Sequence, residues 1–250
     1  IYAFDIKLGI ILMDDFGSMT YLDAINKDNA AKLYSDAASS LIQIQKMIST
    51  KKMQHYDEKK LYEEMSLFVD WYLIKLKNIS LAKIDLGILD KFFKFIAKKV
   101  SLQPQVFVHR DFHSRNLMFL GGTEQNPGIL DFQDALVGPI TYDLVSLLKD
   151  AYIECDEEFI IDQSVRYWQK AKKENLPIQN DFSKFYEDFE LMGVQRHLKI
   201  LGIFSRLSIR DKKNQYLDDI PLVEKYLWNT ISRYKELFPL RNLLNKLIIK

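Results

Sequence analysis

The stretch VHRDFHSRNLMFLGGTEQNPGILDFQDA, residues 108–135, concentrates polar side chains between short apolar runs. The polar side chains are those of His109, Asp111, His113, Asn116, Asp131 and Asp134. QVFVH, LMFL and GILDF have the length and composition of short strands, and GGTEQNPG is rich in turn-forming residues. The pattern predicts a strand, a polar loop and a hairpin that together form a site, although a simple polar turn is the plainer interpretation.

The remainder of the chain has the composition of an ordinary globular protein. Of its 250 residues, 48% are hydrophobic and 28% are charged, with 35 basic against 34 acidic side chains. No basic run indicates a nucleic-acid partner, and no apolar run approaches the roughly 20 residues that span a bilayer. The single cysteine, Cys155, excludes an internal disulfide and fits a reducing compartment. We therefore expect a cytoplasmic protein.

Helical periodicity dominates outside the polar stretch. The apolar spacing predicts helices over residues 26–48, 57–72, 85–99, 140–151, 156–174, 182–208 and 221–236. The run LGIILM, residues 8–13, is short, apolar and partly β-branched, which predicts a buried strand. The expected fold class is α+β, mostly helical, with a few short strands that carry the polar cluster.

Two chemistries compete for the polar loop. If His109, Asp111 and His113 continued a strand, they would share one face and could bind zinc or iron for hydrolysis. If the segment is a loop instead, Asp111 alone faces the chemistry. Asn116 follows Asp111 by five positions and Asp131 ends the returning strand, which is the HRD-x-x-x-x-N plus D-F-x pattern of phosphoryl transfer. A hydrolase needs neither residue, so the spacing favours phosphoryl transfer.

VHRDFHSRN and ILDFQDALVGPITYDLVSLL resemble the aminoglycoside phosphotransferase and choline kinase superfamily, whose members are relatives of the protein kinases. Within it, MDDFGSMTYLD, NPGILDFQDALVGPITYDLVSLLKDAY and GVQRHLKILGIFSRL resemble the bacterial anomeric kinases of N-acetylmuramate and N-acetylglucosamine. The resemblance covers nearly the whole chain. It implies a protein-kinase-like fold, ATP and Mg²⁺ as cofactors, and an amino-sugar hydroxyl as acceptor in peptidoglycan recycling.

The resemblance also implies roles for residues of the polar stretch. Asp111 would accept or orient the proton of the acceptor hydroxyl, while Asn116 and Asp131 would supply oxygen ligands to Mg²⁺. His109 is expected to hold the loop by hydrogen bonds. GPITYDLVSLL has the pattern of a helix start, and Asp143 in its first turns is expected to support the same loop structurally. Two alternatives stay open: a kinase of the same superfamily acting on an aminoglycoside, choline or an amino alcohol, and a catalytically silent binding protein.

Two further sites follow from the resemblance. LGIILMDDFG resembles the hinge between the lobes of a kinase, where backbone groups near Met13, Asp14 and Asp15 would bind the nucleotide. Arg196 and His197, in GVQRHLK, are candidates for contacts with the sugar. The expected partner is a small-molecule amino sugar, with no nucleic acid, membrane or obligate protein partner.

The resemblance implies a first lobe with a phosphate-covering loop and a strand lysine, and neither is found before Ile10. We therefore expect residues 1–17 to be the end of that N-terminal lobe and the hinge. Residues 18–250 would form the helical C-terminal lobe with the catalytic loop. With the N-terminal lobe largely absent from this chain, we expect weak or no nucleotide turnover from these 250 residues alone.

Overall fold

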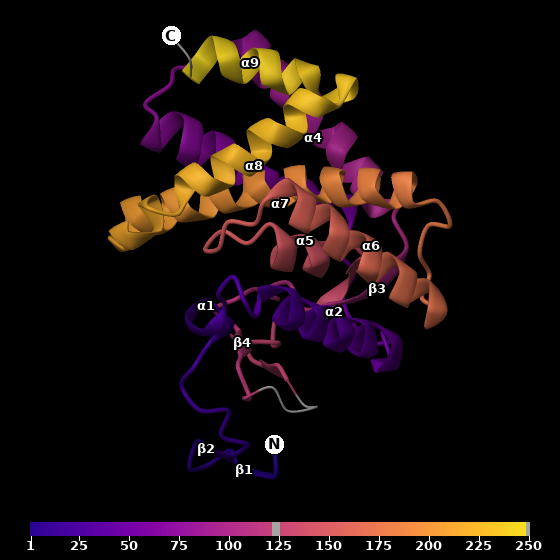
Figure 1. The fold of residues 1–250 in the computed structure, drawn as a ribbon. Coiled ribbons are helices and arrows are strands. Elements are labelled where there is room, and N and C mark those ends of the chain that lie inside the picture. Colours follow the sequence, from indigo (N-terminus) through magenta and orange to yellow (C-terminus); the bar gives the residue numbers. More distant parts are fainter. Residues whose placement is uncertain (122–125, 249–250) are drawn as a thin grey trace.

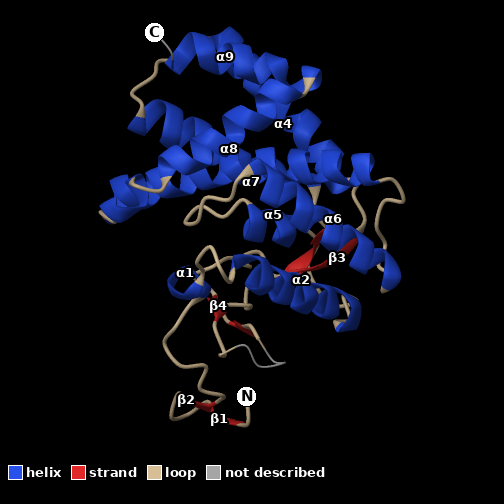
Figure 2. Ribbon diagram, viewed as in Figure 1, coloured by secondary structure: helices blue, strands red, loops and turns tan. Residues whose placement is uncertain are grey.

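The computed structural model describes residues 1–121 and 126–248, and helices make up most of this part of the chain (Figures 1 and 2). The α-helices are α1 (Tyr21–Ala24), α2 (Ala30–Met47), α3 (Glu58–Leu67), α4 (Lys83–Ser101), α5 (Tyr142–Leu148), α6 (Glu157–Lys173), α7 (Phe182–Asp211), α8 (Ile220–Arg233) and α9 (Phe238–Ile248). Shorter helical pieces are η1 (Phe68–Leu76), η2 (Asn214–Leu217) and η3 (Lys235–Leu237). The prediction of a mostly helical chain with a few short strands is confirmed.

The strands form antiparallel pairs, each of two strands. They are β1 (Ala3–Asp5) with β2 (Ile10–Leu12), β3 (Gln105–Val108) with β6 (Leu136–Pro139), and β4 (Leu117–Met118) with β5 (Gly128–Ile129). The β4–β5 pair confirms the predicted hairpin strands. Residues 122–125 of the predicted turn GGTEQNPG lie outside the described residues.

β6 was not predicted, because its Gly138 and Pro139 were interpreted as the start of a helix. The structure places them in a strand against β3. A Cβ on Gly138 would lie 3.2 Å from Val108 of β3 and 3.2 Å from Tyr56. Glycine therefore allows the backbones to approach closely at this point, and the helix α5 begins only at Tyr142.

The prediction of a buried strand over residues 8–13 is wrong. β2 covers only Ile10–Leu12, and the side chains of Ile10, Ile11 and Leu12 are 58–60% exposed. Within the described residues, β2 pairs only with β1, and Figure 1 shows this hairpin away from the helical body. An apolar run therefore marks a face suited to burial, but the described chain provides no surface that covers it. The expectation of a missing N-terminal lobe stays a prediction.

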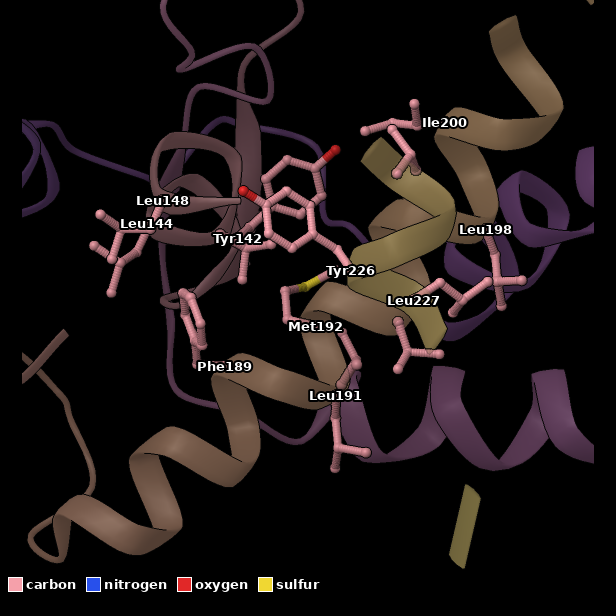
Figure 3. Close-up of a cluster of buried hydrophobic side chains, with 14 of the residues drawn as sticks. Tyr142, Leu144, Leu148, Phe189, Leu191, Met192, Leu198, Ile200, Tyr226 and Leu227 are labelled. Atoms are coloured by element: carbon pink, nitrogen blue, oxygen red, sulfur yellow. The ribbon is translucent and has the colours of Figure 1, made fainter. Parts of the chain in front are cut away.

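The core is arranged around α7, the longest helix described. Helices α3, α4, α5 and α8 and the η1 segment all pack against it. Figure 3 shows Tyr142 and Leu148 of α5, Phe189 and Met192 of α7, and Tyr226 of α8 in one buried cluster. Full burial of a large apolar side chain of this kind contributes about 1.5–3 kcal/mol. This packing fixes α5 and α7, the helices that reach the polar loop.

Aspartate caps explain why several predicted helix boundaries agree with the structure. At the start of each of three helices an aspartate side chain accepts a hydrogen bond from a backbone amide of the first turn. The pairs are Asp57 with Lys60 in α3, Asp156 with Phe159 in α6, and Asp181 with Ser183 in α7. The helix predicted over 57–72 continues instead through η1, where π-helical geometry begins at Phe68. Within residues 1–121 and 126–248, no helix is both long and apolar enough to cross a membrane.

Gly202 allows α7 to cross the end of α3 at close range. A Cβ at this position would lie 2.4 Å from the carbonyl carbon of Leu67 and 2.7 Å from its oxygen. Both atoms are backbone, so they cannot move aside without shifting the helix junction.

We predict that Gly202→Ala lowers the free energy of unfolding by about 1–3 kcal/mol, because the added methyl group overpacks this crossing. Gly87→Ala is the matched control, since Gly87 lies on the exposed side of α4 with nothing within 4 Å of its Cβ position. It should raise stability by about 0.5–1 kcal/mol. Urea unfolding measures both, and equal effects of the two substitutions would contradict the close crossing.

Candidate active site

The polar loop of residues 109–116 connects β3 to β4 and is joined to the end of β5. The Asn116 side-chain amide donates to the Asp111 carbonyl oxygen at 3.0 Å. The Leu130 amide donates to the Asn116 carbonyl oxygen, also at 3.0 Å, and Asp131 follows directly. These two bonds bring Asp111, Asn116 and Asp131 to the same end of the β4–β5 hairpin.

Oxygen atoms of Asn116 and Asp131 are available at this end. Because Asn116 donates with Nδ2, its Oδ1 is the atom left to accept or to bind a cation. Asp131 is exposed, and its Oδ1 accepts from Gln133 Nε2 at 2.7 Å. Its backbone has a φ of 70°, which turns the chain sharply after β5. One carboxylate and one amide oxygen fit Mg²⁺, which in proteins takes one or two carboxylates and completes its shell with phosphates and water.

The alternative metal site of His109, Asp111 and His113 is not formed. In the part of the chain that the structure describes, no group of three or more His, Cys, Asp or Glu side chains could hold a metal ion. Desolvation lowers the pKa of His113 to about 4. Burial likewise lowers the pKa of His109, although the nearby charges of Asp111 and Asp131 raise it in part. His109 is therefore a buried, neutral ring that lies close to both carboxylates.

Buried carboxylates hold the backbone of the loop at both of its ends. Asp143, fully buried on α5, accepts from the amides of His109 at 2.7 Å and Arg110 at 3.0 Å. Burial raises the pKa of Asp143 to about 7, although the two amide bonds lower it. Asp150, also buried, accepts from the Ser114 amide at 2.9 Å. The two ends of the loop are thus bound by carboxylates that are seven residues apart in the sequence.

Asp150 was not predicted as a site residue. Its position after the apolar run LVSLL is compatible with a solvent-exposed helix end, and no sequence signal distinguishes an exposed aspartate from a buried one here. In the structure its second oxygen accepts from the Tyr152 amide at 3.1 Å, so the same carboxylate shapes the turn that follows α5. Asp143, by contrast, was predicted because it lies at the start of a recognisable helix.

Arg110 has a backbone conformation that is unfavourable for a residue with a side chain. Its φ is 78°, and such a conformation costs about 1–3 kcal/mol and persists only where the surroundings enforce it. The backbone is held by Asp143, and the guanidinium donates to Glu64 of α3 at 2.5 Å. Glu64 also forms an ion pair at 3.2 Å with Lys199 of α7 and accepts from the Tyr56 hydroxyl. Glu64 was another residue that sequence reasoning missed.

Arg196 and His197, adjacent on α7, have different environments. Burial lowers the pKa of Arg196, but the charges of Tyr142, Asp111 and Asp150 outweigh this effect and raise the pKa. His197 is fully buried and stacks on Tyr226 with ring centroids 5.6 Å apart. Arg196 is also buried, at 5% exposed. The expectation that His197 contacts a sugar is not supported, because its ring is enclosed by the core.

Met13, Asp14 and Asp15 lie between β2 and α1. Met13 is exposed, Asp14 accepts from the Tyr2 hydroxyl, and Asp15 accepts from the Gly17 amide at 2.8 Å. These contacts are local, and within the described residues the three side chains make no bond to the 109–116 loop.

The chain after this segment docks on the β4–β5 hairpin. The Phe119 amide donates to the Met19 carbonyl oxygen at 2.8 Å, and Thr20 bridges to Met118 of β4. A Cβ on Gly128 would lie 2.7 Å from the Phe16 ring, so this ring is packed directly on the backbone of β5. Residues 13–20 are thereby connected to the hairpin that positions Asn116 and Asp131.

Comparison with known proteins identifies relatives over most of the chain. Residues 5–173 match the model of the phosphotransferase enzyme family. The chain is 41% identical to an N-acetylmuramate/N-acetylglucosamine kinase of Neisseria meningitidis over 248 residues, which are 98% of this chain and 73% of the relative. A protein of the same name from Pseudomonas aeruginosa is also 41% identical, over 99% of this chain and 72% of its own.

A solved structure shows the same fold at low sequence identity. The crystal structure of choline kinase from Cryptosporidium parvum matches 93% of this chain and 74% of its own, with a TM-score of 0.57 and 13% identity. The predicted protein-kinase-like fold is therefore confirmed for the described residues.

We predict that Asp150→Asn lowers the free energy of unfolding by about 1–3 kcal/mol, because an amide cannot accept from both the Ser114 and Tyr152 amides. Hydrogen exchange at the Ser114 amide should become faster in the variant. Asp162→Asn on the exposed face of α6 is the matched control and should change stability by less than about 0.5 kcal/mol. Unchanged exchange at Ser114 would show that Asp150 does not hold the loop.

The Glu64 cluster predicts a pH-dependent stability. Burial raises the pKa of Glu64, but Lys199 and Arg110 outweigh it and hold the pKa below its ordinary value of 4.5. A lowered pKa in the folded state stabilises the protein above pH 4.5, and this contribution is lost as the pH falls through the lowered pKa.

We therefore expect Glu64→Gln to lower the free energy of unfolding by about 3 kcal/mol at pH 7, since it leaves two cations without their counter-charge. The difference from wild type should shrink in acid, where the wild-type carboxylate is itself protonated. Glu63→Gln, at the exposed neighbouring position, should have little effect at any pH. Urea unfolding at several pH values tests this, and a pH-independent difference would contradict it.

Proposed function

The chain belongs to the phosphotransferase enzyme family, and on this premise we propose that it transfers a phosphoryl group from ATP to a hydroxyl group of a small amino sugar. It is a phosphotransferase, as its resemblance predicted. The observation that carries the proposal is the loop of residues 109–116, in which hydrogen bonds hold Asp111 and Asn116 beside Asp131.

The acceptor we propose is the anomeric hydroxyl of N-acetylmuramate or N-acetylglucosamine, in peptidoglycan recycling. Two relatives that bear these sugars in their names are 41% identical over nearly all of this chain. The low identity to choline kinase supports the shared fold alone. We further propose that the enzyme acts in the cytoplasm, which agrees with its single thiol at Cys155.

Asp111 is the residue that we propose as the general base. It would accept the proton of the attacking hydroxyl or orient that hydroxyl for attack. An anomeric hydroxyl is more acidic than an ordinary alcohol, so a plain carboxylate suffices. The contacts of Asp143 and Asp150 keep the loop in place, and accurate positioning contributes up to about 7–11 kcal/mol in favourable cases.

Asn116 Oδ1 and the Asp131 carboxylate are the ligands that we propose for Mg²⁺. Bound there, the ion would neutralise negative charge on the transferring phosphoryl group. The two side chains provide only part of an octahedral shell, which suits a metal that arrives with the phosphates of the nucleotide. His109 and Asp143 would support this arrangement without contacting the substrates.

We propose that residues 1–17 belong to the hinge side of the nucleotide site and residues 18–250 to the helical lobe. Backbone groups at Met13 and Asp15 would bind the adenine, because the segment that follows them is tied to the β4–β5 hairpin. Arg196 would face the acceptor or restrain the Asp111 carboxylate, since its charge lies close to that of Asp111.

The full-length protein, supplied with ATP, Mg²⁺ and N-acetylmuramate or N-acetylglucosamine, should form the sugar 1-phosphate. Asp111→Asn should lower kcat by about 10²–10⁴-fold, because the proton then has no acceptor. Asp162→Asn, on the exposed face of α6, is the control and should keep wild-type activity. Phosphorus NMR identifies the product and its position on the sugar.

Two results would contradict the proposal. Phosphorylation of choline or an aminoglycoside in place of both sugars would assign another acceptor within the same family. Nucleotide binding without transfer to any of these acceptors would indicate a binding protein that has kept the fold.

A further inference from the structure

Most basic side chains around the 109–116 loop already have a carboxylate partner. Arg110 and Lys199 pair with Glu64 at 2.5 and 3.2 Å, and Lys149 pairs with Glu190 at 2.5 Å. Arg196 is buried, at 5% exposed, and has no ion pair among the described residues. The charges of Arg110, Lys199 and Lys149 are therefore compensated within the protein.

Arg115 is different. Its side chain is 40% exposed, and the carboxylate paired with it, that of Asp219 at the start of α8, is 3.9 Å away. Among the described residues its side chain makes no hydrogen bond, so the N–H donors that do not face Asp219 remain free for a ligand. It belongs to the same 109–116 loop, immediately before Asn116 and four residues after Asp111 in the sequence.

The guanidinium of Arg115 is held in a fixed orientation. It lies over the ring of Tyr152 at 3.6 Å from the centroid, and Tyr152 in turn stacks on Phe204 of α7 with centroids 6.2 Å apart. The Tyr152 amide is bound by Asp150, which also binds the loop. A guanidinium that stacks on a ring by its face keeps its edges free, and those edges form the planar fork that matches a carboxylate.

The two proposed acceptors differ in one charged group. N-acetylmuramate is N-acetylglucosamine with a lactyl ether on O3, and this ether ends in a carboxylate. O3 is two ring carbons away from the anomeric carbon, so a sugar whose anomeric hydroxyl faces Asp111 carries its carboxylate close to the same loop.

We propose that Arg115 binds the lactyl carboxylate of N-acetylmuramate and so sets the preference of the enzyme for this sugar over N-acetylglucosamine. The inference rests on the proposed function, because it takes these sugars as acceptors. Asp219 orients the guanidinium from one side, and the acceptor carboxylate engages the free edge. N-acetylglucosamine lacks the carboxylate and does not use this contact.

The test compares kcat/KM of the full-length enzyme on three acceptors: N-acetylmuramate, its methyl ester and N-acetylglucosamine. For Arg115→Ala, kcat/KM should fall about 10- to 100-fold more on N-acetylmuramate than on N-acetylglucosamine, the factor expected for a charge-assisted contact. The wild-type enzyme should lose a similar factor on the methyl ester. The variant should accept acid and ester equally, a result that a merely structural role would not produce.

Two further variants sharpen the comparison. Arg115→Lys keeps the charge but loses the fork, so its preference should lie between those of wild type and Arg115→Ala. Arg206→Ala removes a basic residue of α7 that forms no ion pair among the described residues, and should leave the ratio of the two sugars unchanged.

Each remaining outcome overturns a defined statement. Equal losses on both sugars in Arg115→Ala, or a wild-type enzyme indifferent to the methyl ester, would overturn the role of Arg115 and leave the proposed function intact. A selective loss in Arg206→Ala instead would assign the contact to that residue. A wild-type enzyme that phosphorylates neither sugar would overturn the proposed function and this inference with it.

Discussion

The candidate site depends on the hydrogen bonds that buried carboxylates accept from backbone amides of the loop. Asp143 binds the amides of His109 and Arg110, and Asp150 binds that of Ser114. Bonds of this kind are strong in a low-dielectric interior, and leaving one unmade is costly. They allow Arg110 to keep a positive φ that an unsupported residue would abandon. The core around α5 and α7 thus acts on the site by fixing two carboxylates rather than by contacting the chemistry.

Much of this fold was predictable from local sequence signals, and the exceptions share a physical cause. Helix periodicity placed α6 and α7 within a few residues of their observed bounds. β6, the exposure of β2 and the burial of His197 were missed, because each depends on what packs against the segment. Periodicity identifies an apolar face but does not say whether another element covers it.

The residues of the candidate site likewise include some that the sequence predicted and others that only the structure reveals. Asp111, Asn116 and Asp131 were found from their spacing, since phosphoryl transfer needs oxygen-bearing side chains in a fixed order along the chain. The structure brings them to one end of the hairpin through bonds of Asn116 to Asp111 and Leu130. Asp150, just after α5, and Glu64 of α3 support that arrangement, and their partners are 36 and 46 residues distant in sequence. No local pattern encodes such a pairing, so these supports become visible only in three dimensions.

The charges around the loop suggest how acceptor recognition and chemistry are coupled in the proposed enzyme. Asp111 and Arg115 belong to one short loop that Asp143 and Asp150 hold at both ends, so their relative positions cannot vary much. An acceptor held by its carboxylate at Arg115 would therefore present its anomeric hydroxyl at a defined distance from the base. Because misplacement of a reacting group by about 1 Å can cost 10²-fold in rate, rigidity of this loop would convert binding energy at Arg115 into correct orientation at Asp111. An acceptor without the carboxylate would have to obtain the same orientation from the sugar ring alone.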